Sequence, residues 1–185
     1  MPHIIFSHTK SREKTYQQKL LSQKQWFEEY DFPVFMPKNT NSESLNKDVL
    51  AVNKELLTLQ KRWDKIEWDY FKIVGGFKNV KLLPKYISHI TLYGPEGEFQ
   101  APNLLFVRLR TTKDKKLILE TIGHELIHII LGKFFEKQKL GYEEVEWLVD
   151  NLILQSDLSK LFPDYKQQTV GKPKKQILGN ILDSR

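Results

Sequence analysis

Cysteine is absent from this chain of 185 residues, and its absence limits the chemistry that the chain can support. A disulfide framework is excluded, and so is every metal site that depends on thiolate ligands. Any bound metal ion must therefore rely on imidazole nitrogens and carboxylate oxygens. The sequence contains only five histidines, so the candidate sites are few.

Long apolar runs are also absent. No stretch approaches the roughly 18 consecutive apolar residues that a membrane-spanning helix needs. The opening apolar segment, residues 3–6, is too short for the core of a signal peptide. With 40% hydrophobic and 28% charged residues, the composition is that of a globular protein. We therefore expect a cytoplasmic protein with no membrane partner.

Positive charge is in excess, but its distribution is not typical of a nucleic-acid-binding protein. The net charge is +6, yet the lysines are interleaved with glutamate and aspartate along the chain. The densest basic cluster, residues 172–175, contains no aromatic side chain on which a base could stack. A DNA-associated metalloprotease would also need a zinc ribbon or a basic and aromatic segment, and neither is present. We therefore do not expect a nucleic-acid partner.

The first 80 residues are expected to be mostly helical. After a strand-like start, good helix formers dominate residues 10–30, and Asp31-Phe32-Pro33 should end this helix. A second helix is predicted over about residues 44–71, before Gly75-Gly76. We interpret residues 1–80 as a packing layer or a docking surface for a partner protein.

The pattern changes to short β-prone runs after residue 85. These runs cover residues 86–93 and 104–109, and turn-forming residues lie between them at 94–97 and 101–103. This arrangement predicts a hairpin or meander in a small, mostly antiparallel sheet.

A buried helix should follow the strands. Thr111 is a candidate cap, and an almost wholly apolar run extends over residues 117–131 before Gly132. A helix that is apolar on nearly all sides should lie in the core. The fold class is therefore α+β, with a compact functional unit at about residues 81–160 and a tail at residues 161–185.

The predicted buried helix contains His124-Glu125-Leu126-Ile127-His128. Residues four apart on a helix point the same way, so His124 and His128 can offer two imidazole nitrogens to one zinc ion. Such polar groups would be costly in an apolar helix without a partner. Zinc held by three protein ligands keeps a position for water and can lower its pKa to about 7. Glu125 would then act as the general base on the metal-bound water.

The third metal ligand is expected to be acidic, because the other three histidines lie far upstream without helical pairing to the motif. A stripe of apolar residues predicts an amphipathic helix over about residues 142–155. Its members are Val145, Leu148, Val149, Leu152 and Ile153. Glu146 lies on the flank of this stripe and can complete the zinc site, with Glu143 and Glu144 as alternatives. Asp150, one turn later, can accept the free ring N–H of a ligating histidine.

These residues resemble the gluzincins, a family of zinc peptidases that carry HExxH followed by a Glu-x-x-x-Asp pattern on the next helix. Glu146 and Asp150 fit that pattern. The small size and the strands before the motif helix look most like the minigluzincins, and the resemblance covers about residues 86–155. It implies a zinc metalloendopeptidase with one Zn²⁺ per chain and a peptide or protein substrate.

The resemblance also implies how substrate would bind. In such peptidases the strand before the motif helix forms the upper rim of the cleft and pairs with extended substrate. The residues that would take this role are Asn103, Leu104, Leu105, Phe106 and Val107. Some minigluzincins have a C-terminal segment in the cleft, so residues 161–185 are a candidate cover. Tyr93 and Tyr142 are candidate donors to the oxyanion, by proximity in the chain alone.

The prediction from the sequence is thus a zinc-dependent peptidase in which Glu125 activates the attacking water. The alternative is a regulatory or scaffold protein that retains the zinc site. Such a protein would either cleave one specific partner or be catalytically inactive.

Overall fold

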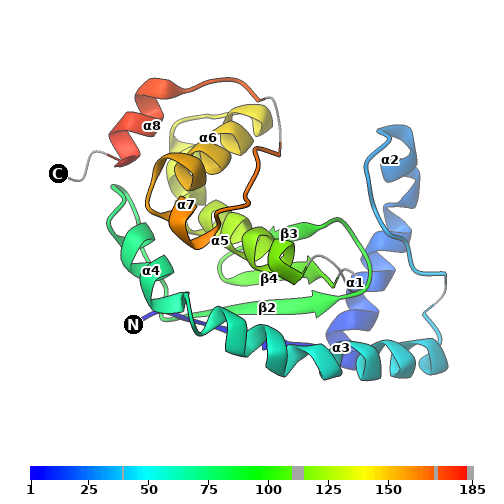
Figure 1. Ribbon diagram of the computed structural model, residues 1–185. Helices are drawn as coiled ribbons and strands as arrows, with labels where there is room; N and C mark the ends of the chain where they lie inside the picture. The colour runs from blue at the N-terminus through cyan, green and yellow to red at the C-terminus, as the bar shows by residue number, and fades with distance from the viewer. Residues whose placement is uncertain (39, 110–114, 169–170, 183–185) are drawn as a thin grey trace.

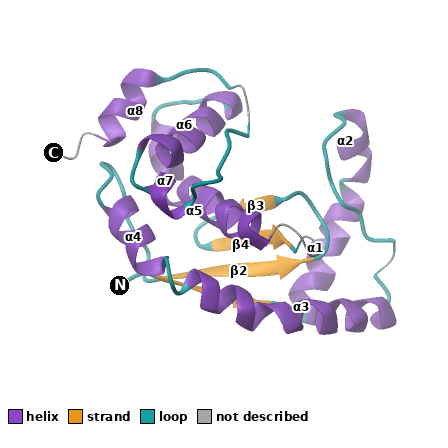
Figure 2. Ribbon diagram, in the orientation of Figure 1, coloured by secondary structure: helices purple, strands orange, loops and turns teal. Residues whose placement is uncertain are grey.

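A four-stranded sheet lies at the centre of the fold in the computed structural model, which describes residues 1–38, 40–109, 115–168 and 171–182. The strands are β1 (His3–Ser7), β2 (Lys85–Thr91), β3 (Gly97–Gln100) and β4 (Leu104–Arg108). Their order in the sheet is β1-β2-β4-β3 (Figure 2). β1 pairs with β2 and β2 with β4 in parallel, whereas β3 and β4 are antiparallel.

The prediction of a mostly antiparallel sheet is therefore wrong, although the α+β class is confirmed. Residues 86–93 and 104–109 do not form a hairpin, because the chain leaves β2, forms β3 at the edge, and returns as β4 between β3 and β2. β3 was not predicted, because it lies in the segment whose residues favour turns. Its four residues are too few for a clear alternation of apolar and polar positions.

The two faces of the sheet contact different cores, as the alternation of side chains along a strand requires. Ile4, Tyr86 and Leu105 point to one face and belong to the main core. Phe106 points to the other face, where it stacks on Tyr16 at 4.2 Å between ring centroids. Residues of α5 and α6 pack in the main core. Residues of α1 and of the segment that follows it pack in the smaller core.

The described residues of the N-terminal region form four helices in place of the two that were predicted. They are α1 (Lys10–Ser22), α2 (Lys24–Glu29), α3 (Ser42–Trp63) and α4 (Glu67–Gly75). The first break, between α1 and α2, lies at Gln23, whose N–H donates to the carbonyls of both Lys19 and Leu20 in a tight turn. The turn contains no glycine or proline from which it could have been predicted. The second break lies between α3 and α4. It allows both Trp63 and Tyr70 to reach the core, where their ring centroids are 5.2 Å apart.

Side chains from α3 and α4 cover the outer edge of β1. The Ile4 N–H donates to Glu67 Oε1 at 2.8 Å, and the Phe6 N–H donates to Gln60 Oε1 at 3.1 Å. Gln60 Nε2 in turn donates to the Ile4 carbonyl at 3.1 Å. This edge of the sheet is satisfied, and β3 forms the other edge.

The second half of the chain is dominated by α5 (Lys115–Lys137) and α6 (Tyr142–Gln155), followed by α7 (Leu158–Leu161) and α8 (Lys175–Leu182). The bounds predicted for α6 are confirmed. α5 is buried as predicted, but it continues past Gly132 to Lys137, and the chain then reverses through Lys139 at φ 53°. The predicted cap at Thr111 lies outside the described residues. None of the helices in the described ranges is long and apolar enough to cross a membrane.

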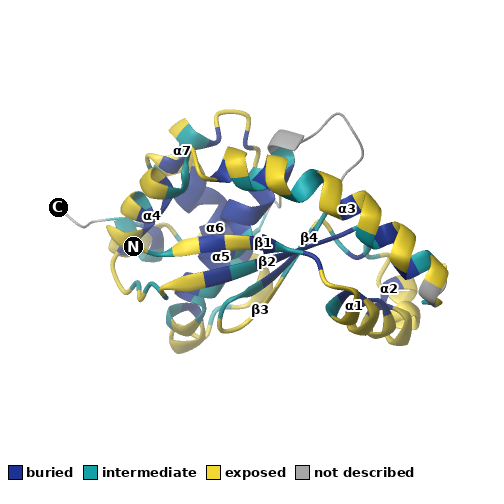
Figure 3. Cartoon of the chain, turned by 90° about the horizontal axis from the view of Figure 1, so that it is seen from below, coloured by how far each residue is buried: buried dark blue, intermediate teal, exposed yellow. Residues whose placement is uncertain are grey.

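One core unites the three segments that were drawn from the sequence. Ile4 and Trp63 from the N-terminal region, Leu126 and Leu148 from the middle unit, and Ile181 from the tail all belong to it. The buried positions lie on the inner sides of the sheet and helices, and exposed positions lie outside (Figure 3). The boundaries at about residues 80 and 160 therefore do not separate independently packed units.

Candidate metal centre

α5 and α6 bring His124, His128 and Glu146 together as a buried group that could hold a metal ion. The Nε2 atoms of the two histidines are 2.9 Å apart. Glu146 spans both rings, with Oε2 at 3.3 Å from His124 Nε2 and Oε1 at 3.3 Å from His128 Nε2. Ligands of a tetrahedral zinc ion lie about 3.3 Å from one another, given Zn–N and Zn–O bonds of about 2.0–2.1 Å. The donor set therefore fits zinc in both spacing and chemistry.

The two alternative acidic ligands point elsewhere. Glu143 Oε2 lies 3.1 Å from Lys172 Nζ, and Glu144 Oε1 lies 2.8 Å from Lys174 Nζ. Glu144 also accepts the N–H of Gly141 at the start of α6. Of the three acids, only Glu146 lies on the face of α6 that meets the histidines.

Tyr165, in the segment after α7, connects His124 to Asp150. Its hydroxyl donates to Asp150 Oδ1 at 2.6 Å and lies 2.7 Å from His124 Nδ1. Because the hydroxyl proton is used by the carboxylate, the Tyr165 oxygen accepts from His124 Nδ1–H. This tautomer leaves the lone pair of His124 on Nε2, the atom that faces His128 and Glu146. Asp150 thus acts on the histidine through a tyrosine, since its own oxygen is 3.6 Å from Nδ1.

The electrostatics of the group show that it attracts positive charge. Burial alone would lower the pKa of His124, but the hydrogen bond to Glu146 and the surrounding carboxylates raise it above its ordinary value. Burial would likewise raise the pKa of Glu146, but its bonds to His124 and His128 lower it to about 2. A metal cation can replace the protons that these groups would otherwise share.

Glu125 lies beside the three candidate ligand residues without being one of them. Its Oε1 approaches β3 so closely that a Cβ added to Gly97 would lie 2.5 Å from it. Glycine is therefore needed at this point of close contact between the strand and α5. Burial, as the largest cause, raises the pKa of Glu125 above its ordinary value. A carboxylate with a raised pKa is better suited to accept a proton from water and to return it.

A cavity of about 1080 Å³ opens over these residues. His124, Glu125, His128 and Glu146 line it from α5 and α6, and Gly97, Glu98 and Phe99 line it from β3. The Phe99 ring stacks on His128 at 5.2 Å between centroids and 10° between planes. The site is thus open to a ligand of considerable size.

The rim strand of this cavity is β3, and the prediction of Asn103, Leu104, Leu105, Phe106 and Val107 is wrong. β4 (Leu104–Arg108) is an interior strand with β2 on one side and β3 on the other, so its backbone groups are already paired. An extended peptide can add only to an exposed edge. Within the described residues, the backbone of β3 pairs with β4 alone, which leaves its outer edge open.

The tail forms a wall of the cavity. Residues 164–168 line it, and the Gln168 N–H donates to Asp150 Oδ2 at 2.9 Å. α8, by contrast, packs against α6. Of the two tyrosines considered as oxyanion donors, Tyr142 lines the cavity, whereas Tyr93 donates to Asp48 on α3 at 3.3 Å.

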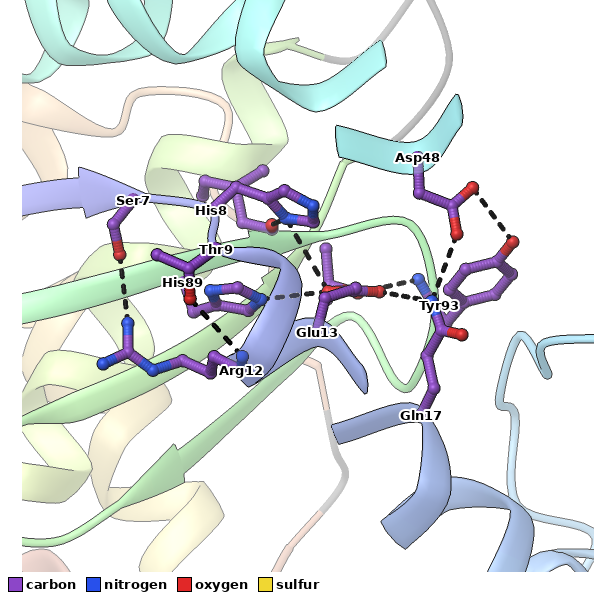
Figure 4. A network of polar contacts seen from close by, with 11 residues as sticks. Ser7, His8, Thr9, Arg12, Glu13, Gln17, Asp48, His89 and Tyr93 are labelled. Atoms are coloured by element: carbon purple, nitrogen blue, oxygen red, sulfur yellow. Dashed lines mark hydrogen bonds and ion pairs between the residues drawn. The ribbon is translucent and has the colours of Figure 1, made fainter. Parts of the chain in front are cut away.

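A second buried group of histidine and glutamate ties α1 to the other face of the sheet (Figure 4). Glu13 is fully buried, and its Oε1 accepts bonds from Thr91 Oγ1 and Gln17 Nε2, each at 2.9 Å. Its Oε2 accepts from His89 Nε2 at 2.9 Å. His8 Nδ1 lies farther away, at 3.7 Å.

Hydrogen bonds account for most of this second group, but His8 Nε2 and His89 Nδ1 are buried and have no hydrogen-bond partner among the described residues. His8 Nδ1 is 2.7 Å from the carbonyl oxygen of Ile90, which can only accept, so this nitrogen carries a proton. It therefore has no lone pair for a metal unless the bond to Ile90 is broken. Burial would raise the pKa of Glu13, but the bonds from His89 and Gln17 hold it below its ordinary value. The group is a buried carboxylate anchored by donors.

Comparison of the chain with models of protein families, with curated proteins and with solved structures gives no match. The site must therefore be interpreted from its own geometry.

The site residues that could be predicted from the sequence are those that follow the helical period. His124, His128, Glu146 and Asp150 were expected together, and the structure brings them together. Tyr165 was missed because it belongs to an irregular segment with no motif. Gly97 and Phe99 were missed because β3 was not recognised as a strand.

Proposed function

We propose that this chain is a zinc-dependent peptidase of the gluzincin type, most like the minigluzincins. The observation that carries the proposal is the convergence of His124, His128 and Glu146 at separations of 2.9–3.3 Å in an open cavity, with Glu125 beside them. A buried donor set of this kind without thiolates favours zinc over calcium or magnesium, which prefer oxygen ligands.

A bound zinc ion would polarise the scissile carbonyl and lower the pKa of the attacking water. The remaining work belongs to the side chains. Glu125 would receive the proton of the attacking water on a carboxylate oxygen and pass it to the leaving amine. Gly97 allows Glu125 to lie against β3, and Tyr165 and Asp150 hold His124 in the tautomer that presents Nε2.

The substrate would bind as an extended peptide. The open edge of β3 offers backbone N–H and C=O groups along the cavity, beside Glu125 at Gly97 and beside His128 at Phe99. A peptide paired with this edge would carry its backbone past both residues.

The test is the Glu125→Gln substitution in zinc-loaded protein, assayed on a pool of internally quenched peptides. Wild type is expected to cleave, and a chelator should abolish cleavage. Glu125→Gln should retain zinc while its turnover falls by at least about 100-fold, because the proton acceptor is lost. Glu136→Gln, on the exposed side of the same helix, is the matched control and should cleave as wild type.

Two outcomes would count against the proposal. Zinc-loaded wild type that cleaves no member of the pool would favour the regulatory or scaffold alternative. Undiminished turnover by Glu125→Gln would remove the role assigned to this carboxylate.

A further inference from the structure

A cluster of aromatic side chains lies on α2 and the loop after it. Trp26, Phe27, Tyr30 and Phe32 contact one another, with the ring of Trp26 at 5.4 Å from Phe27, 5.0 Å from Tyr30 and 5.8 Å from Phe32. Phe27 is buried and fastens α2 to the smaller core, but Trp26 is 49% exposed. Packing of α2 explains Phe27 and does not explain why a tryptophan faces solvent beside it.

This cluster shares a cavity with the candidate metal centre. Trp26, Phe27 and Phe32, named here the aromatic wall, line the same space of about 1080 Å³ as His124 and Glu125. In Figure 1, α2 stands apart from α6 and α7, which lie over α5. The volume lies just above the range of roughly 300–1,000 Å³ that is usual for small-molecule sites. It suits a ligand that extends beyond a single amino acid.

Two charged residues that line the cavity together with the aromatic wall, Lys19 and Glu98, are paired with each other. Lys19 Nζ bonds to Glu98 Oε1, and the Tyr16 hydroxyl donates to the other oxygen of Glu98 at 3.2 Å. The wall is therefore apolar where it meets the cavity, and it favours an apolar side chain over a charged one.

We propose that the aromatic wall is a specificity subsite that receives an aromatic or large aliphatic side chain of a peptide whose backbone pairs with β3. This inference rests on the proposed function and names its substrate class: extended peptides with a bulky apolar residue at a fixed distance from the cleaved bond. The open edge of β3 would bind the backbone of any extended peptide, and the aromatic wall would select peptides by their apolar side chain.

Binding tests the subsite independently of catalysis. The probes are fluorescein-labelled octapeptides of Ala, Ser and Gly that carry one Phe at each position in turn, with the Phe-free peptide as parent. They are titrated by fluorescence polarisation into zinc-loaded protein carrying Glu125→Gln. We expect at least one Phe peptide to bind about tenfold more tightly than the parent, since a Phe ring is removed from water.

Trp26→Ala, added to this background, should erase the difference between the best Phe peptide and its parent. Trp68→Ala is the matched control, because Trp68 is 60% exposed on α4 and lies outside the cavity. The inference is overturned if no Phe peptide exceeds the parent, or if the difference survives Trp26→Ala. It is also overturned if the chain self-associates in sedimentation and Trp26→Ala abolishes the association, because the wall would then be a contact between copies.

Digestion of the same peptides by wild type separates this inference from the proposed function. Cleavage without preference for Phe would support the peptidase and contradict the subsite. Phe-selective binding without any cleavage would support the subsite and contradict the peptidase.

Discussion

At the scale of single residues, the chemistry of the site depends on where His124 keeps its proton. Tyr165 is placed so that its oxygen accepts from Nδ1 while its hydroxyl donates to Asp150. Burial first, and the charge of Asp150 second, raise the pKa of Tyr165 far above its ordinary value, so the hydroxyl stays protonated. The imidazole of His124 is thereby held with the lone pair of Nε2 toward His128 and Glu146.

Tyr165→Phe should weaken zinc binding by about 10- to 100-fold, the usual effect of removing a partner of a ligating histidine. The ring keeps its packing, so the fold should be retained. Competition with a chromogenic chelator measures the affinity. Tyr30→Phe, which changes a largely exposed tyrosine directly after α2, should bind zinc as wild type. Equal affinity in Tyr165→Phe and wild type would show that the hydroxyl does not control the tautomer.

The contact between Tyr165 and His124 also affects what removal of the tail, residues 161–185, would do. A chain shortened to end at Leu161 would lose Tyr165 and the Gln168 N–H that bonds to Asp150. Any activity gained by opening the cavity would therefore be set against weaker metal binding. Neither contact follows from a helical or strand period, so only the ligand residues at regular spacing could be predicted from the sequence.

At the scale of elements, α5, which carries the candidate metal ligands His124 and His128, is packed closely around Gly123 and loosely around Gly132. A Cβ added at Gly123 would lie 2.7 Å from the ring of Phe162 and 3.3 Å from that of Tyr70. A Cβ added at Gly132 would meet nothing within 4 Å. The two glycines of one helix therefore have different reasons to be glycine.

Gly132→Ala should raise the free energy of unfolding by about 0.5–1 kcal/mol, because alanine is the better helix former. Gly123→Ala should lower it by roughly 1–3 kcal/mol, because the aromatic rings must shift. Urea unfolding of both variants and wild type provides the comparison. The same sign of change in both would contradict the packing described for α5.

The elements that sequence could predict are those with a long, clear period. α6 has a complete apolar stripe over fourteen residues, and its bounds agree with the prediction. β3 has four residues, and its identity as a strand depends on pairing with β4 across the chain. The parallel pairing of β2 with β4 likewise follows from tertiary contacts that local patterns do not contain.

At the scale of the whole molecule, α1 is joined to the sheet through the buried carboxylate of Glu13. Its donors come from α1 itself and from β2, so the contact connects α1 to the sheet against which α5 packs. If these donors lost the Glu13 carboxylate as their acceptor, the folded chain would be destabilised, because water cannot reach them.

Glu13→Gln should lower the free energy of unfolding by roughly 1–3 kcal/mol at pH 7, because an amide cannot accept from all of these donors. The pKa of Glu13 is below its ordinary 4.5 in the folded chain. Its contribution is therefore fully present above pH 4.5 and is lost as the pH falls through the folded pKa. The difference from wild type should shrink well below pH 4.5, as measured by urea unfolding across pH.

Glu29→Gln, at an exposed position on α2, is the control for that series and should match wild type throughout. A difference that stays constant down to pH 3 would mean that folding does not lower the pKa of Glu13.

The metal content of the purified protein tests the central claim most directly. Mass spectrometry after loading should find about one zinc ion per chain in wild type, in Glu125→Gln and in Glu13→Gln. It should find none in His128→Ala or Glu146→Ala, with circular dichroism confirming that both variants are folded. Wild type that resists loading, or zinc retained in both ligand variants, would contradict the account.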